Sequence, residues 1–157
     1  MALSPTPRTP SAIDAIADAY VTRLCELDPL SATSMGVKGY DHLSTDLSPA
    51  GITALAEAAR AVLAELDGAQ PQDEVDEVTL AAMRERIGLE LELFEAGELH
   101  AQLNNIASPV QYLRDVYDIM PTATVEDWSN IASRMAALPA TMAGFVESLR
   151  YAAERGR

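Results

Sequence analysis

The chain has 157 residues, of which 48% are hydrophobic, and a formal net charge of −13 at pH 7. This length suits a single domain of ordinary size. The acidity argues against binding to nucleic acid or to an anionic membrane surface, because both need clustered Lys and Arg. Only 5% of the residues are aromatic, and the abundance of Ala, Leu, Glu and Arg favours helix over strand.

The chain shows no export or membrane signal. Its first residues lack a cationic start followed by an apolar core, so they do not resemble a secretory signal. No apolar run approaches the roughly 20 residues of a transmembrane helix. A single cysteine, Cys25, requires no oxidising compartment, and its place between Leu24 and Leu27 favours a packed side chain over a nucleophile. We therefore expect a soluble cytoplasmic protein, with acidic helix faces that keep it in solution.

The N-terminal third contains three predicted helices. Residues 1–10, which contain three prolines, are predicted to be a disordered lead-in. Ser11 is a suitable N-cap for a helix that runs to about Glu26. Pro29 can start a short helix that ends near Gly36. Residues 36–47 resemble a loop, and the Ser48-Pro49 pair predicts a third helix.

A long helix is predicted from Asp73 to Leu103, about 45 Å in length. Gly88 and Gly97 fall within it, and each marks either a bend or a close helix contact. The spacing of its apolar residues predicts a core face made of Leu80, Met83, Ile87, Leu91, Phe94 and Leu99.

The C-terminal third repeats the same start and stop signals. Ser108-Pro109 starts a helix and Met120-Pro121 ends it. Thr124 is expected to cap the next helix with Asp127, and Leu138-Pro139 to separate it from a last one. The core face after Thr124 is expected to contain Trp128, Ile131 and Met135. We predict an all-α fold of about six helices, mostly antiparallel neighbours with short turns, and one domain over residues 11–157.

Metal chemistry has little support in the sequence. The only histidines are His42, in the predicted loop, and His100, near the end of the long helix. A catalytic zinc needs three protein ligands, and neither histidine has a second one at a four-residue spacing. A di-iron bundle needs Glu-x-x-His, whereas Glu98 lies two residues before His100 and Glu95 lies five before it. A site that combines both histidines with a carboxylate stays open as an alternative.

Two other groups of residues are candidates for chemistry. Paired carboxylates can act in acid–base work if burial raises one pKa, and tyrosines can line a cleft. Solvated helix surface and ordinary helix contacts are the simpler interpretations of these groups. The carboxylates are Glu85, Glu90, Glu92, Glu95 and Glu98, and the polar-aromatic residues are Asn104, Asn105, Tyr112, Tyr117 and Tyr151. We assign no catalytic, cofactor-binding or metal residue from the sequence.

The segment from Leu27 to Gly36, followed by Gly39-Tyr40-Asp41-His42 and Ser48-Pro49, resembles the N-terminal region of a bacterial family known as domain of unknown function 885. The resemblance continues through Ser108-Pro109 and the segment from Thr124 to Pro139. Members of this family resemble zinc metallopeptidases with a His-Glu-x-x-His motif in their C-terminal half. The 157 residues contain no such motif.

The resemblance implies that the chain is the N-terminal part of a longer, metallopeptidase-like protein. It implies a non-catalytic helical region that walls one side of a substrate cleft, with zinc bound only in the full-length protein. Its partner would be the C-terminal catalytic part, or a second copy bound through an exposed apolar face. The alternatives are an independent helical module that binds a protein or peptide, and a small enzyme that uses the carboxylates or tyrosines without metal.

Overall fold

The computed structural model describes residues 8–157, which form six α-helices and one short 3₁₀ helix. These residues contain no strand, which confirms the all-α prediction. The elements are α1 (Ala12–Leu27), α2 (Pro29–Ser34), α3 (Pro49–Asp67), α4 (Glu74–Glu95), η1 (Glu98–His100), α5 (Pro109–Ile119) and α6 (Val125–Ala153). None of the helices within this range combines the length and the apolar composition that crossing a membrane requires.

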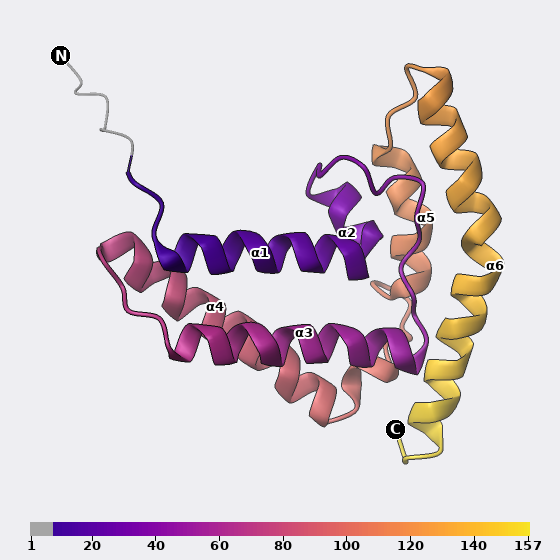
Figure 1. Cartoon of the computed structure of the whole chain (residues 1–157). Coiled ribbons are helices and arrows are strands. Elements are labelled where there is room, and N and C mark those ends of the chain that lie inside the picture. The colour runs from indigo at the N-terminus through magenta and orange to yellow at the C-terminus, as the bar shows by residue number, and fades with distance from the viewer. Residues whose placement is uncertain (1–7) are drawn as a thin grey trace.

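The helices form two antiparallel groups that cross one another (Figure 1). Helices α1, α3 and α4 pack together in one group, and α5 and α6 form a hairpin that stands across its end. Helix α2 contacts both α1 and α5, and η1 contacts α6. Helix α3 also contacts α6, so the two groups are joined by the short elements and by this direct helix contact.

The main apolar core lies between α1, α3 and α4. Leu80 and Ile87 belong to it, while Met83 and Leu91 pack against its edge, as their spacing on the long helix predicts. Cys25 is fully buried, which agrees with a packing role. The buried members of the core are Ile13, Ala59, Val62, Leu66, Leu80 and Ile87.

The predicted helix starts are confirmed by the caps that form there. Ser11 caps α1 through a capping box with Asp14, and Thr124 caps α6 through a box with Asp127. The Ser48 side chain accepts a hydrogen bond from the Gly51 amide at 3.3 Å. Each cap satisfies amide groups that the first helical turn leaves unpaired.

The predicted helix from Asp73 to Leu103 is too long. Helix α4 ends at Glu95, and Gly97 follows with a φ of 80°. This left-handed conformation suits glycine and turns the chain into η1. Gly88 does not mark a close helix contact, because a β-carbon there would meet nothing within 4 Å. Gly97 is thus the residue that divides the predicted helix.

The predicted break at Leu138-Pro139 is also wrong, because α6 continues through Pro139. Proline removes the hydrogen bond to the carbonyl four residues earlier, which belongs to Met135. Both Met135 and Pro139 are exposed, so water can hydrate the freed carbonyl. Burial of Arg134 and Phe145 on the other side of the helix holds the two halves in line.

The buried face of α6 differs from the predicted one. Ile131 is buried, but Trp128 and Met135 are each 58% exposed. The face that packs inward lies against the extended segment 43–48. Thr141 Oγ1 lies 2.9 Å from Ser44 Oγ, and Ser148 Oγ donates to the Leu47 carbonyl at 2.7 Å. This face is partly polar, so apolar spacing alone does not identify it.

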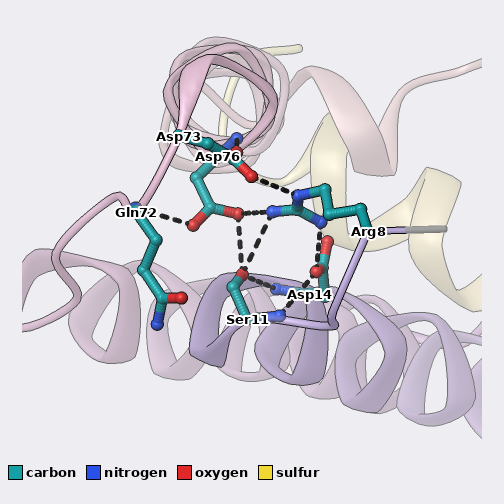
Figure 2. A network of polar contacts seen from close by, with 6 residues as sticks. All are labelled: Arg8, Ser11, Asp14, Gln72, Asp73 and Asp76. Carbon is teal, nitrogen blue, oxygen red and sulfur yellow. Dashed lines mark hydrogen bonds and ion pairs between the residues drawn. The ribbon is translucent and has the colours of Figure 1, made fainter. Parts of the chain in front are cut away.

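A network of polar contacts joins the starts of α1 and α4 (Figure 2). The Arg8 guanidinium contacts Asp14 and Asp76, and it reaches Asp73 Oδ2 at 2.5 Å. Asp76 is fully buried, where it accepts from Ser11 Oγ at 2.7 Å and from the Gln72 amide at 2.9 Å. Residues 1–7 of the predicted lead-in lie outside the described residues, whereas Arg8 ties the chain to both helices.

Two glycines in helices allow a matched test of packing. A β-carbon at Gly144 in α6 would lie 2.9 Å from the Ser48 backbone nitrogen, whereas Gly88 in α4 has open space. We expect Gly144→Ala to destabilise the chain by about 1–3 kcal/mol, because the backbone of segment 43–48 must move. Gly88→Ala should stabilise it by about 0.5–1 kcal/mol through helix propensity. Urea denaturation measures both, and a stabilising Gly144→Ala would contradict the close contact.

The Arg8 network predicts an acid dependence of stability. The Ser11 amide and Arg8 lower the pKa of Asp14, and Arg8 together with the Asp76 amide lowers that of Asp73, both from 3.8. A pKa lowered in the folded state means that the unfolded state binds the proton more readily. The resulting stability is therefore present above pH 3.8 and is lost as the pH falls below it.

We expect Arg8→Ala to lower the thermal unfolding midpoint by about 2–4 °C at pH 7, and by less at pH 3, where the carboxylates become protonated. Arg23→Ala is the matched control, because Arg23 forms an exposed pair with Glu26 on α1, and such pairs contribute little. Differential scanning calorimetry at both pH values tests this. An equal loss at pH 7 and pH 3 would show that the ion pairs are not the cause.

Candidate functional site

A groove of about 540 Å³ opens where the two helix groups meet. Leu30 and Ser31 of α2, Ile52 and Leu55 of α3, and Leu99 of η1 line one part of it. Helix α5 supplies the other part through Tyr112, Asp115, Val116 and Ile119, and Phe145 of α6 also contributes. Most of the lining is apolar, which is typical of sites that bind small molecules or peptide side chains.

The polar end of the groove is formed by Asp28 and Thr45. Asp28 caps α2, and its carboxylate accepts from the Ser31 amide at 3.3 Å and from the hydroxyl groups of Ser31 and Thr45. The Leu30 amide donates to Thr45 Oγ1 at 3.2 Å. These bonds attach the loop segment near Thr45 to the start of α2, so the two together form one wall of the groove.

Behind this wall lies Arg134, a charged side chain that is only 1% exposed. Its Nε donates to the Leu43 carbonyl at 2.7 Å. Its Nη2 lies 3.1 Å from the Tyr40 carbonyl and 2.9 Å from Thr33 Oγ1. It also faces the Pro29 carbonyl at 3.3 Å. One guanidinium thus joins α6, α2 and the loop of residues 36–47.

No carboxylate contacts the Arg134 guanidinium directly within the described part of the chain. Asp41 is one hydrogen bond away, because Thr33 Oγ1 donates to its Oδ1 at 2.7 Å. Burial lowers the pKa of Arg134, and the nearby negative charges of Asp41 and Asp28 oppose that effect. The guanidinium is therefore held by neutral oxygen acceptors. The negative charges nearest to it, on Asp41 and Asp28, do not contact it directly.

The two histidines occupy different environments. His42 is exposed in the loop between α2 and α3, whereas His100 in η1 is 4% exposed. The ring of His100 lies between Phe94 and Tyr151, with centroid distances of 5.6 Å and 4.7 Å. Burial, and then the charge of Arg155, lowers the pKa of His100.

The candidate metal site that uses both histidines has no support from the geometry. Across residues 8–157, no group of three or more His, Cys, Asp and Glu side chains is arranged to hold a metal ion.

The glutamate row lies on a solvated face. All five side chains are exposed, and three pair with arginines: Glu85 with Arg86 at 3.1 Å, Glu95 with Arg60 at 3.5 Å, and Glu98 with Arg157 at 2.8 Å. Desolvation raises the pKa of Glu90. Burial of Tyr20, and then the charge of Glu90, raises the pKa of Tyr20. None of the five lines the groove.

The polar-aromatic candidates separate into different roles. Tyr112 is 56% exposed and lines the groove, whereas Tyr151 packs against His100. Burial raises the pKa of Tyr117, and the nearby Arg134 charge opposes this. Asn104 bonds to its own loop, since its Nδ2 donates to the Ala107 carbonyl at 2.6 Å. Only Tyr112 therefore belongs to the groove.

Sequence reasoning missed Arg134 and the groove. Arg134 lies three residues after Ile131 and eleven before Phe145, which places it on the buried face of α6. A charged residue at such a position is the available signal, because full burial of Arg is rare unless its donors are satisfied. The groove has no comparable signal, since its walls come from six separate segments.

The comparisons with known proteins agree with this organisation. No curated protein matches the chain in sequence. A family model described as "Bacterial protein of unknown function (DUF885)" matches residues 29–157. The match begins at the first residue of α2 and includes all segments that line the groove except Asp28. Because the family model covers most of its length, the chain belongs to the DUF885 family.

Proposed function

We propose that this chain is a non-catalytic helical region that walls one side of a substrate cleft in a larger, metallopeptidase-like protein. The observation that carries the proposal is the open apolar groove between α2, α3, η1 and α5. Its lining holds apolar side chains and two carboxylates, Asp28 and Asp115. Such a surface can hold apolar side chains of a substrate in place.

The surroundings of the groove support a covered position in the larger protein. Ile119 and Tyr112 line it and are each 56% exposed. Nearby in sequence, on the segment that leads into α5, Leu103 is 61% exposed and Ile106 is 83% exposed. Neighbouring exposed apolar side chains of this size commonly mark a surface that another part of a protein or a ligand covers.

The second candidate is an independent helical module that binds a protein or peptide. It is favoured by the core between α1, α3 and α4, which is formed by this chain's own residues. Both candidates use the same groove. They differ in whether a catalytic part of the same protein faces it.

The test uses the protein from its natural gene and a groove variant, Ile119→Glu. Ile119 lines the groove and is half exposed, so the substitution spares the core. If the groove walls a substrate cleft, the charge should raise KM for hydrolysis of apolar peptides about 3–10-fold while kcat and bound zinc stay unchanged. Val78→Glu is the matched control, because Val78 is 69% exposed on α4 and does not line the groove.

Two outcomes would contradict the proposal. Unchanged KM in Ile119→Glu would remove the groove from the cleft. A natural product that lacks peptidase activity but binds peptides, with binding lost in Ile119→Glu, would favour the independent module.

A further inference from the structure

His100 is the central member of a stack that joins four elements. Its ring lies 5.6 Å from Phe94 of α4 and 4.7 Å from Tyr151 of α6. Arg60 of α3 lies over the Phe94 ring at 5.3 Å, and Arg155 lies over the Tyr151 ring at 3.5 Å. The stack therefore has an arginine at each end and the imidazole in the middle.

The Nδ1 atom of His100 is buried and has no hydrogen-bond partner. A neutral imidazole tolerates this, because one of its nitrogens carries no hydrogen. A protonated imidazole carries a hydrogen on both nitrogens, so Nδ1–H would become a buried donor without an acceptor. Such a donor is costly, and the geometry therefore favours the neutral ring.

The charged groups around the stack do not offset a new positive charge. Arg155, two residues after the end of α6, lies over the Tyr151 ring, and Arg60 of α3 lies over the Phe94 ring. The nearby glutamates are already paired: Glu95 and Glu57 with Arg60, and Glu98 with Arg157. The aromatic faces of Phe94 and Tyr151 attract cations, but each already has an arginine.

Release of His100 would change the groove, because η1 forms one edge of it. Leu99 and Gln102, on either side of His100, line the groove. Segment 97–100 contacts α3, α4 and α6, and its side-chain contacts include the packing of the His100 ring on Tyr151 and the pair of Glu98 with Arg157 at 2.8 Å. The latter pair is exposed on both sides and contributes little.

We propose that His100 is an acid-sensitive latch, and that its protonation releases η1 from α6 and opens the η1 edge of the groove. The sign follows from the chemistry. The pKa of His100 is lowered below 6.5 in the closed form, whereas a released ring regains its ordinary value. The open form therefore binds the proton more readily, and opening becomes more favourable as the pH falls below 6.5. Over that range the opening constant rises toward tenfold per pH unit. This proposal does not depend on the proposed function.

The experiment is an NMR titration of the chain from pH 8 to pH 5. It follows the imidazole signals of both histidines and the backbone amides of residues 96–103. We expect the His100 imidazole to titrate below its ordinary pKa of 6.5, and the amides of Leu99 and Gln102 to shift together with it. His42→Gln is the matched control and should leave the transition of these amides unchanged.

His100→Phe keeps an aromatic ring in the stack and removes the titrating group. In this variant the amides of residues 96–103 should keep their closed positions down to pH 5. If the amides of Leu99 and Gln102 do not follow the His100 imidazole in the titration, or if the same amide transition persists in His100→Phe, the latch is wrong. The wild-type titration decides the first point even if the variant fails to fold.

Discussion

The buried guanidinium of Arg134 is the contact on which the functional half of this structure depends. The loop of residues 36–47 contains no helix or strand, and its carbonyls at Tyr40 and Leu43 accept hydrogen bonds from Arg134 of α6. A guanidinium has five donors in a fixed planar arrangement, so one side chain satisfies both carbonyls and Thr33 of α2 as well. An apolar residue at that position would leave buried acceptors unpaired.

This contact explains how a short helix and a loop become a wall. Arg134 holds α2 and residues 36–47 against α6, while Asp28 and Thr45 join the same two segments on the groove side. The opposite edge is held by η1, through His100. The groove is therefore bounded by one wall fixed by satisfied hydrogen bonds and one edge fixed by stacking around an unsatisfied nitrogen. A groove in which α2 and residues 36–47 are fixed while η1 can move suits the proposed position in a substrate cleft.

Local signals predicted the fold and failed at the site. The serine–proline pairs and capping residues act within one helical turn, and so Ser48-Pro49 and Thr124 marked their helices from sequence alone. The predicted helix break at Pro139 was wrong because the effect of a proline depends on whether water reaches the freed carbonyl, here that of Met135. That exposure is set by the tertiary structure. The predicted burial of Trp128 was wrong because apolar spacing does not reveal that α6 packs on the polar segment 43–48. The groove is beyond local patterns, since α2 and α5 lie about 80 residues apart in the chain.

The most direct test of this account is hydrogen exchange in Arg134→Met, compared with Arg150→Met, which removes an exposed arginine from the same helix. The account predicts that Arg134→Met lowers the protection of amides in residues 29–47 by at least tenfold, leaves the core amides of α1, α3 and α4 protected, and costs about 2–4 kcal/mol of stability. Arg150→Met should change neither. If residues 29–47 keep their protection in Arg134→Met, the guanidinium does not hold the groove wall and the account is wrong.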